Sequence, residues 1–411
     1  MVVGEFTEDV DVVILGGGPA GYSAAFALAR GGRSPIVVDT RGDLGGTCLH
    51  AGCIGSKTLL HELCSAGASL DHATERAAAH VATLAKGLDA TARSLGVRVL
   101  KGTARFADRR TVQVAGESVG RLRFKRAIIC TGGWRASSDA TVPAIDVLQD
   151  PSSLKGSVCV LGNSTDAMEL AAMAAAAGCT VTLACGDALL PEVPDTLVRH
   201  LKRTLQRELT IASDPVDADL TIDATGGSPD CSALDLHSTQ AACTAEGWIK
   251  VDEQMRTADT RILAAGRCTG RSLRAGAALR MGAVAASTIL EGHDAFDPAV
   301  EPVCAWTIPG LTWCGPPALD GLAHVIVPWG HSGQAVLRGE AATGRTMLAW
   351  DPVTGIVHGA GAIGVDAAEH AEAFTLAVEL AATIEDLAAC TPAHPTKAEL
   401  LGETARQAIA T

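Results

Sequence analysis

Residues 11–39, DVVILGGGPAGYSAAFALARGGRSPIVVD, contain the motif on which the fold depends. The segment DVVIL predicts a short buried strand, YSAAFALAR predicts a helix, and PIVVD predicts a second strand that ends at Asp39. The turn GGGPAG places Gly16, Gly18 and Gly21 in GxGxxG register between the first strand and the helix. This succession of elements is the fingerprint of a dinucleotide-binding βαβ unit.

There is a physical reason for a glycine at each of these three positions of the turn. Gly16 makes the turn, Gly18 lets the backbone approach a pyrophosphate, and Gly21 lets the helix pack closely on the strand. The helix N-terminus then presents its N–H groups and the positive end of its dipole to the phosphates. Asp39 is placed to accept hydrogen bonds from a ribose. The fingerprint alone does not distinguish FAD from NAD.

Length and composition limit the class of protein. A chain of 411 residues is expected to form two or three domains, and 47% hydrophobic with 19% charged residues is typical of globular proteins. The net charge of −13 disfavours binding to nucleic acid or to anionic lipid. The acidic N-terminus is unlike a signal peptide. The apolar run 170–185 turns β-branched after Gly178, which predicts a helix and a strand rather than a membrane span. We therefore expect a soluble, cytoplasmic protein.

The 13 cysteines do not form the pattern of a disulfide scaffold or of a zinc site, so no metal is expected. Cys48 and Cys53 stand apart, in GGTCLHAGCIGSK at residues 45–57. In a regular helix their Cα atoms would lie about 8 Å apart, too far for a disulfide. The glycines at 45, 46 and 52 permit a distorted turn that closes this gap. Taken alone, the spacing favours two unrelated buried cysteines.

The same segment carries a resemblance to a known family. It resembles the active-site stretch of the class I pyridine nucleotide–disulfide oxidoreductases, usually GGTCLNVGCIPSK, and its tail SKTLLH is most similar to dihydrolipoamide dehydrogenases. In that family the first cysteine, here Cys48, exchanges with the substrate, and the second, here Cys53, faces the flavin. Asn and Pro of the usual motif are His50 and Gly55 here.

The resemblance extends almost from end to end. AIICTGG at 127–133, GWIKVDEQMRT at 247–257 and ILAAG at 262–266 are similar to further FAD-binding segments, and DPVTGIVHGAGAIG at 351–364 is similar to the interface domain. In AHPTKAE, His394 and Glu399 match the family's HPxxxE spacing. The resemblance implies that this His is the acid/base for the substrate thiol, oriented by the Glu, and enters the site from the partner subunit. Histidine suits that role because its pKa lies near neutrality.

The resemblance implies two sets of site residues. The catalytic set is Cys48, Cys53, Lys57, Glu169, His394 and Glu399. The cofactor-binding set is Gly16, Gly18, Pro19, Ala20, Gly21, Asp39, Gly46, Thr47, Lys57, Thr131, Gly132, Gly266 and Arg267. Lys57 matches the lysine near the flavin and Glu169 its ion-pair partner. Arg267 stands where the family has an Asp that holds the FAD ribityl chain, a departure that puts tight FAD binding in doubt.

The second nucleotide site departs from the pattern more strongly. VCVLGNSTDAMELA begins at residue 158 with a strand, turn and helix, but its GxGxxG has become GxSxxA. Ser164 adds a side chain where the backbone should touch a pyrophosphate, and Asp166 adds a negative charge. The following strand ends at Ala184–Cys185, without a ribose-binding acid, and most of the family's β-meander is missing before residue 219. We expect lost or weakened NAD(P) binding, although divergence with NADH binding kept is the alternative.

We therefore predict an α/β flavoprotein with two dinucleotide-binding domains and a C-terminal α+β dimerisation domain. The FAD domain is expected at residues 1–154 and 241–296, a shortened NAD(P)-like domain at 155–240, and the interface domain at 297–411. If His394 serves a neighbour's Cys48, the protein is a homodimer with a shared active site. The expected activity is FAD-dependent thiol–disulfide exchange with a small thiol substrate, with O2 as one possible electron acceptor.

Three alternatives stay open. The first is an NAD-dependent dihydrolipoamide dehydrogenase, and the second is a flavoenzyme that uses the Cys48 thiolate for C–S bond chemistry. The third is a non-catalytic paralogue that keeps the fold as a binding module. The substrate is not evident from the residues, because Trp306, Trp313 and Trp329 fit a core as well as a pocket.

Overall fold

The computed structural model describes residues 7–117, 120–133, 141–227, 229 and 231–410. Its contacts divide the chain into two compact units, and each is assembled from separate segments. Unit 1 comprises residues 1–58, 74–136 and 226–298, and unit 2 comprises residues 59–73, 137–225 and 299–411. The predicted three-domain boundaries stay a prediction.

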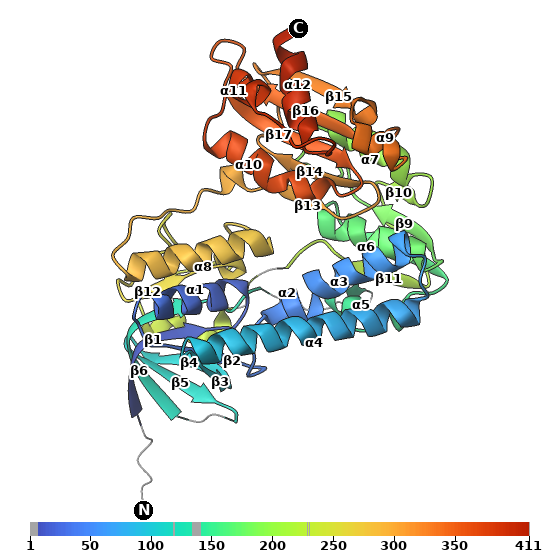
Figure 1. Cartoon of the computed structure of the whole chain (residues 1–411). Helices are drawn as coiled ribbons and strands as arrows, with labels where there is room; N and C mark the ends of the chain where they lie inside the picture. Colours follow the sequence, from blue (N-terminus) through green and yellow to red (C-terminus); the bar gives the residue numbers. More distant parts are fainter. Residues whose placement is uncertain (1–6, 118–119, 134–140, 228, 230, 411) are drawn as a thin grey trace, which may run out of the picture. The chain divides into compact units, whose positions relative to one another are not determined.

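A seven-stranded mixed sheet forms the centre of unit 1 (Figure 1). Its order is β3-β2-β1-β6-β5-β4, with β12 also paired to β6. The neighbouring strands β3, β2, β1, β6 and β12 are parallel to one another. β5 pairs antiparallel with β6, and β4 pairs antiparallel with β5. The strands are β1 (Thr7–Leu15), β2 (Pro35–Asp39), β3 (Arg98–Lys101), β4 (Thr103–Asp108), β5 (Thr111–Ala115), β6 (Gly120–Ile129) and β12 (Ile262–Ala264).

Alternation along β1 directs its side chains to two different cores, because successive residues of a strand point to opposite faces. Val12 and Ile14 pack with α1 (Pro19–Arg30) and α8 (Ala275–Ile289), which lie side by side over one face (Figure 1). Val13 and Leu15 pack on the other face with apolar residues of β5, β6 and the segment after residue 230. Both faces of the parallel strands are thus covered, as predicted for a dinucleotide-binding sheet.

The connection between β2 and β3 is helical throughout most of its length. It runs through α2 (Gly46–Ala51), α3 (Cys53–Leu60), a π-helical turn (His61–Ser65) and α4 (Leu70–Ser94). The predicted redox segment therefore lies at the start of this connection, directly after the strand that ends in Asp39.

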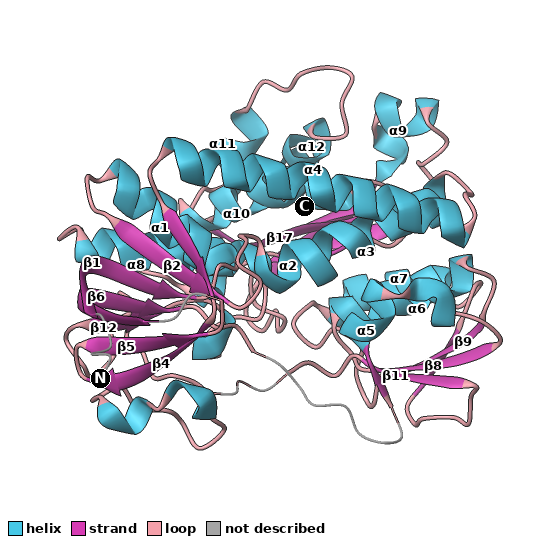
Figure 2. Ribbon diagram, turned by 90° about the horizontal axis from the view of Figure 1, so that it is seen from below, coloured by secondary structure: helices cyan, strands magenta, loops and turns pink. Residues whose placement is uncertain are grey.

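Unit 2 begins with a second parallel sheet, of order β10-β9-β8-β11-β7. Its strands are β7 (Val142–Pro143), β8 (Ser157–Leu161), β9 (Thr180–Ala184), β10 (Thr210–Ala212) and β11 (Leu220–Asp223). The helices are α5 (Ala144–Gln149), α6 (Thr165–Ala176) and α7 (Asp195–Leu205), all near this sheet in Figure 2. Residues 213–219 link β10 to β11, and the shortened NAD(P)-like domain stays a prediction.

The C-terminal part of unit 2 is an antiparallel sheet of order β13-β14-β17-β16-β15, covered by helices. The strands are β13 (Val303–Ala305), β14 (Gly310–Cys314), β15 (Ala323–Pro328), β16 (Arg345–Trp350) and β17 (Val357–Gly364). The helices are α9 (Gly333–Leu337), α10 (Ala371–Glu379), α11 (Ile384–Ala389) and α12 (Glu399–Ala410). Trp313 and Trp329 are fully buried here and so belong to the core, whereas Trp306 is 44% exposed.

Candidate active site

The turn between β1 and α1 consists of glycines because side chains would collide with the backbone. Gly16 has φ +106°, and a Cβ on it would lie 2.3 Å from the Cys130 carbonyl oxygen. A Cβ on Gly21 would lie 1.9 Å from the Gly16 oxygen. Gly18, by contrast, would meet only a backbone atom of Gly46 at 3.9 Å, so its backbone remains open to a ligand. No side chain caps α1 at Gly18, which leaves the N–H groups of its first turn available to a phosphate.

Asp39 ties this turn to the end of β2. Its Oδ2 accepts a hydrogen bond from the Gly17 N–H at 2.7 Å, and its Oδ1 accepts one from the Arg41 N–H at 2.8 Å. Each carboxylate oxygen keeps a further lone pair for a ribose hydroxyl. Gly46, with φ +55°, comes so close to Gly18 that a Cβ would lie 2.6 Å from its Cα.

The remaining predicted cofactor residues lie where β6 and β12 end. Gly132 and Gly266 have φ +79° and +82°, Thr131 is exposed, and Ala20 lies against Gly266. The Nε atom of Arg267 is buried and has no hydrogen-bond partner among the described residues. An orphaned guanidinium nitrogen beside a glycine cradle fits an anionic group, so the residues present suit the pyrophosphate of a dinucleotide.

The helical segment that carries the predicted redox pair is interrupted between the two cysteines. α2 ends at Ala51, Gly52 adopts φ −145° and ψ −117°, and α3 begins at Cys53. The chain therefore departs from a regular helix at this point, and both cysteines are thiols. Cys53 is the largest influence on the raised pKa of Cys48, through its side chain, so the two side chains lie near each other across this break.

Three features act on the pKa of Cys48. The hydrogen bond to Cys53 and then burial raise it far above the usual range of a thiol, whereas the positive charge of Lys57 lowers it. Lys57, one helical turn after Cys53, is therefore close enough to favour the thiolate. A thiol with so high a pKa needs a base to become a nucleophile at neutral pH.

Two residues beside the redox pair were missed by the sequence reasoning. Burial and then the two cysteines raise the pKa of Tyr22, the single tyrosine of the chain, which places its phenol within electrostatic range of both sulfur atoms. The Nε2 of His50 lies 3.0 Å from the Leu44 oxygen and 3.2 Å from Asp43 Oδ1. Both partners accept hydrogen bonds, so Nε2 carries a proton and fixes the loop before α2. The position of Tyr22 directly after the GGGPAG turn was the available signal.

His394 and Glu399 meet in unit 2, as their spacing predicted. The His394 Nδ1 lies 2.9 Å from Glu399 Oε2, at the first residue of α12. The imidazole is 75% exposed and the carboxylate only 14% exposed. The carboxylate is placed to accept a hydrogen bond from Nδ1, and the acid/base role of the imidazole stays a prediction.

Glu169 is buried on α6, where its Oε1 accepts a hydrogen bond from the Trp306 backbone N–H at 3.0 Å. Its predicted partner Lys57 belongs to unit 1, so the Lys57–Glu169 ion pair stays a prediction. For the same reason the meeting of His394 and Glu399 with the two cysteines in one site stays a prediction.

The second strand–turn–helix unit lacks the open backbone of the first. Gly162 turns sharply with φ +139°, but Ser164 caps α6 by accepting a hydrogen bond from the Ala167 N–H at 3.4 Å. The N–H that a phosphate would bind is therefore already satisfied within the protein. The exposed Asp166 adds a negative charge in the first turn of α6. β9 ends at Ala184, with no acid corresponding to Asp39.

Comparison with known proteins identifies the family. Residues 10–213 and 207–282 match the model described as pyridine nucleotide-disulphide oxidoreductase, and residues 320–405 match the dimerisation domain of the same family. The chain belongs to this family. It is 30% identical to a dihydrolipoyl dehydrogenase of Vibrio cholerae, over 95% of this chain and 94% of the relative. It is 28% identical to one of Haloferax volcanii, over 100% of this chain and 98% of the relative.

Two solved structures show the same fold. The flavoprotein disulfide reductase RclA of Escherichia coli superposes with a TM-score of 0.88 at 20% identity, and covers 97% of this chain and 99% of its own. LpdA of Mycobacterium tuberculosis gives a TM-score of 0.87 at 21% identity, with the same coverage. The predicted fold class and family resemblance are confirmed.

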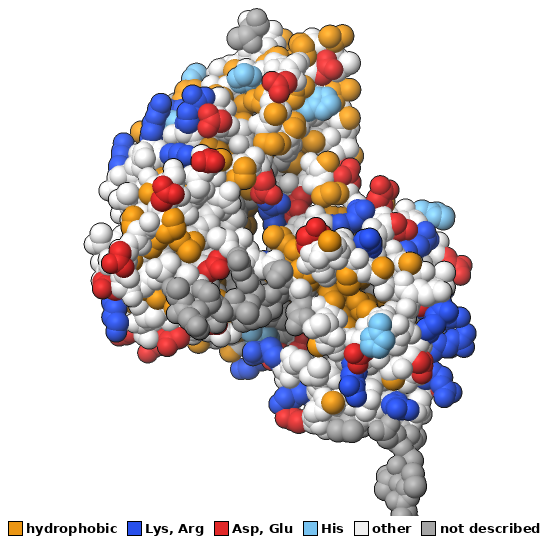
Figure 3. All heavy atoms as spheres, turned by 180° about the vertical axis from the view of Figure 1, so that it is seen from behind, with side chains coloured by type: hydrophobic (Ala, Val, Ile, Leu, Met, Phe, Trp, Pro, Cys, Tyr) orange, Lys and Arg blue, Asp and Glu red, His pale blue; other side chains and the backbone are white. Residues whose placement is uncertain are grey.

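As a member of this family, the chain is an FAD-dependent oxidoreductase that acts on a sulfur group. FAD is therefore the cofactor that the Gly16–Gly21 turn, Asp39 and the Arg267 guanidinium are suited to hold. The C-terminal domain is a dimerisation domain. Large apolar side chains are exposed on this domain, among them Leu337 and Leu380. Figure 3 shows clusters of hydrophobic side chains on the face of the molecule that it presents.

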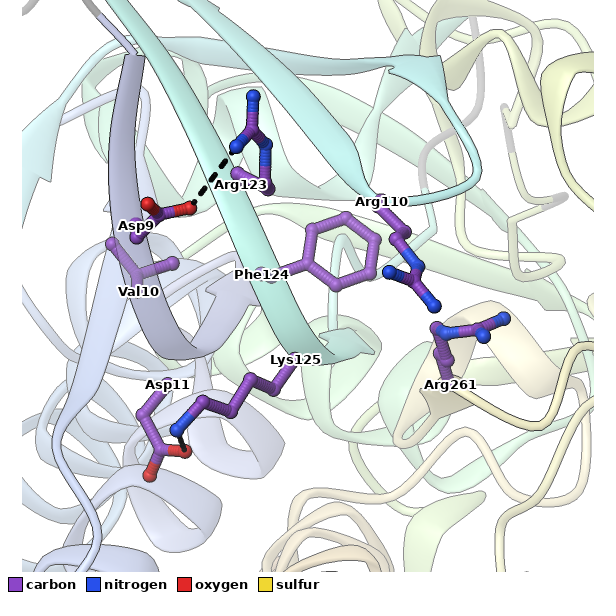
Figure 4. Close-up of a pocket in the computed structure, with 8 residues that line it drawn as sticks. All are labelled: Asp9, Val10, Asp11, Arg110, Arg123, Phe124, Lys125 and Arg261. Atoms are coloured by element: carbon purple, nitrogen blue, oxygen red, sulfur yellow. Dashed lines mark ion pairs between the residues drawn. The ribbon is translucent and has the colours of Figure 1, made fainter.

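A surface cavity of about 470 Å³ is lined by none of the predicted site residues, and Figure 4 shows its lining. It is lined by Asp9, Val10, Asp11, Arg110, Arg123, Phe124, Lys125 and Arg261. These residues belong to the amino-terminal halves of β1 and β6 and to neighbouring turns, whereas the dinucleotide turn follows the carboxyl end of β1. Within the described ranges no group of His, Cys, Asp or Glu is arranged to hold a metal ion. No helix in the same ranges is both long and apolar enough to cross a membrane.

Proposed function

We propose that this flavoprotein oxidises a small dithiol by thiol–disulfide exchange at Cys48 and Cys53, and that NAD(P) is a poor electron acceptor for it. The observation that supports the first part is the interruption of the helix at Gly52, across which Cys53 raises and Lys57 lowers the pKa of Cys48. Two unrelated core cysteines would not require this break, because a continuous helix would hold them apart.

The exchange proceeds from a Cys48–Cys53 disulfide. A substrate thiolate attacks the Cys48 sulfur, the S–S bond breaks, and Cys53 leaves as a thiolate. The second substrate thiol then attacks its own sulfur in the mixed disulfide, which releases the oxidised substrate and leaves Cys48 reduced. Two electrons and two protons have then moved from the substrate to the protein. FAD, when bound, supplies the two-electron acceptor for the resulting dithiol.

Proton transfer in both steps is assigned to the His394–Glu399 pair. A base must remove a proton from each substrate thiol, and an acid must protonate Cys48, whose pKa lies above the usual range. The His394 side chain is exposed and its Nδ1 is held by Glu399, a position suited to a site completed by another chain. We therefore assign the acid/base of each site to His394 of the partner subunit in a homodimer, whose chains associate through the C-terminal domain. The enzyme is assigned to the cytoplasm.

The proposal for NAD(P) is supported by the turn between β8 and α6. A pyrophosphate there must displace the Ser164 cap and lie near the Asp166 carboxylate, and each costs binding free energy. The reduced enzyme then passes its electrons to another acceptor, of which O2 is the candidate we propose to test. The alternative is an NAD-dependent dihydrolipoyl dehydrogenase, which the activity named for the relatives favours.

The test is an anaerobic titration of the FAD-loaded protein, first with dihydrolipoamide and then, in a separate sample, with NADH. We expect dihydrolipoamide to produce a long-wavelength charge-transfer band that is absent in Cys53→Ser, and micromolar NADH to leave the flavin oxidised. Admission of air should restore the oxidised spectrum.

The other outcomes decide between the alternatives. Stoichiometric flavin reduction by micromolar NADH contradicts the proposal for NAD(P) and supports the dehydrogenase. No spectral response to any dithiol contradicts thiol–disulfide exchange. A screen of thioether and thiol substrates then separates C–S bond chemistry from a non-catalytic paralogue.

A further inference from the structure

The His394 imidazole has little direct support of its own. It is 75% exposed, and Glu399 is its hydrogen-bond partner, at 2.9 Å. An acid/base must be held in place, because a displacement of about 1 Å lowers the rate of a reaction by about a hundredfold. The position of His394 therefore depends on what fixes the chain on either side of it.

Lys397 is the most strongly anchored side chain of the segment 393–399. Its ammonium group donates to Val365 O at 2.7 Å, to Glu340 Oε2 at 3.0 Å and to Asp366 Oδ2 at 3.1 Å. These three bonds use all of its protons. The Lys397 side chain is only 9% exposed, and its Nζ lies 5.4 Å from the centre of the Trp329 ring.

The partners of Lys397 come from separate parts of the C-terminal domain. Glu340 follows α9, whereas Val365 and Asp366 follow β17. The two carboxylates offset the cost of burying an ammonium ion, which without partners would be large. The lysine thus joins the segment before α12 to the end of the central strand of the sheet.

The other contacts of the segment are weaker or local. Thr396 Oγ1 donates to the Ala393 oxygen at 2.8 Å, which closes a turn around His394. Ser332 Oγ donates to the Thr396 oxygen at 3.3 Å. Neither carries a charge, and the first does not reach another element.

We propose that Lys397 is a positioning residue: it fixes the segment 393–399 on the sheet and so holds the His394 imidazole where the substrate thiol is deprotonated. The proposal rests on the proposed function of His394. The lysine acts through the backbone and touches neither the substrate nor the reacting sulfur atoms.

The test measures the rate at which dihydrolipoamide reduces the FAD-loaded enzyme, by anaerobic stopped flow, in a double-mutant cycle. Lys397→Met is expected to lower the limiting rate about ten- to a hundredfold, with an unchanged flavin spectrum. His394→Gln is expected to lower it about a hundred- to ten-thousandfold. The double variant should equal His394→Gln within about twofold, because Lys397 acts only through His394.

Arg338→Met is the matched control. Arg338 lies 3.7 Å from the same Asp366 carboxylate, but it is 52% exposed and belongs to the stretch after α9. Its removal takes a positive charge from Asp366 without releasing the segment of His394. The rate should stay within twofold of the wild type.

The outcomes separate the inference from the proposed function. If His394→Gln is slow but Lys397→Met reduces the flavin at the wild-type rate, only the role of Lys397 is overturned. The same holds if the two rate losses multiply in the double variant. An unchanged rate in His394→Gln overturns both. If Lys397→Met does not fold, Glu340→Gln takes its place in the cycle. This variant must slow the reaction about three- to tenfold. A rate for Glu340→Gln within twofold of the wild type overturns the inference.

Discussion

The two strand–turn–helix units of this molecule share one topology and differ at the point where a dinucleotide would bind. In both, a glycine with positive φ turns the chain sharply, Gly16 at +106° and Gly162 at +139°. The helix after Gly16 has no side-chain cap, whereas Ser164 caps the helix after Gly162. The sharp turn is thus needed to connect strand and helix in either unit. The uncapped helix N-terminus is needed only where a phosphate supplies the missing acceptor.

The strand that follows each helix shows the same contrast. β2 ends in Asp39, whose carboxylate holds the glycine turn and keeps lone pairs for a ribose, whereas β9 ends in Ala184. The first unit combines an uncapped helix N-terminus with a terminal acid, and the second combines a capped helix N-terminus with a terminal alanine. The second unit therefore keeps the βαβ topology without either of these two features.

The largest effect is expected from Gly21→Val. Its Cβ would lie 1.9 Å from the Gly16 oxygen, so the backbone must shift, at a cost of about 3 kcal/mol or more. We expect at least a hundredfold loss of FAD affinity, measured as flavin per chain after purification and by rebinding titration. Ala167→Gly at the equivalent position of the second turn should leave the FAD content unchanged. Full flavin content in Gly21→Val would contradict the role assigned to the first turn.

Asp39→Ala should have the next largest effect. It removes two charge-assisted hydrogen bonds to the turn, at 2.7 Å and 2.8 Å, together with the ribose acceptor. The expected loss is about 2 kcal/mol, or roughly thirtyfold in the Kd for FAD, measured by fluorescence titration of the apoprotein. Asp39→Asn, which keeps one acceptor oxygen, should lose clearly less; equal losses would mean that the hydrogen bonds do not matter.

The double variant Ser164→Gly/Asp166→Ala tests whether the second turn can be made more like the first. It opens the helix N-terminus and removes a negative charge that costs about 1 kcal/mol near a phosphate. Calorimetry should show NADH binding about five- to tenfold more tightly, with little loss of stability because glycine is a tolerable cap. If the wild type binds NADH as tightly as the variant does, the Ser164 cap and the Asp166 charge do not weaken NADH binding by the second unit.

The smallest effect is expected from Arg267→Gln. The buried Nε of Arg267 has no hydrogen-bond partner among the described residues, and a screened guanidinium contact is worth about 0.5–1 kcal/mol. The Kd for FAD should rise about two- to fivefold. Arg280→Gln, on the exposed face of α8 near Asp294, is the control and should change nothing. No difference between the two variants would place Arg267 outside the cofactor site.

The parts of the site that the sequence predicted are those whose residues lie close together in the chain. The GxGxxG turn with Asp39, the Cys48/Cys53 segment and the His394–Glu399 spacing each span fewer than thirty residues. Local backbone geometry relates such residues, so a pattern of residue types is enough to indicate them. The broken second turn was recognisable for the same reason.

The contacts that the sequence did not reveal involve side chains whose direction no motif specifies. His50 contacts the Asp43–Leu44 loop and Tyr22 of α1 lies near the cysteines, and the position of these residues in the chain does not show which groups their side chains meet. The buried position of Trp313 and Trp329, and the exposure of Trp306, were likewise undecided. Burial depends on which faces of the sheet are covered, and periodicity alone does not show this for an isolated aromatic residue.

The sequence by itself indicated the fold class and, through the resemblance of its short motifs to a known family, the family and its cofactor, because glycine, acid and cysteine positions within short segments constrain the backbone directly. Weakened NAD(P) binding by the second nucleotide unit stays a prediction. Only the tertiary structure decided how those segments are held. Lys397 lies three residues from His394, yet its partners are 31 to 57 residues away and meet it only in the folded domain. A buried charge needs partners wherever the fold can supply them, and their positions along the chain are set by the fold rather than by any local pattern.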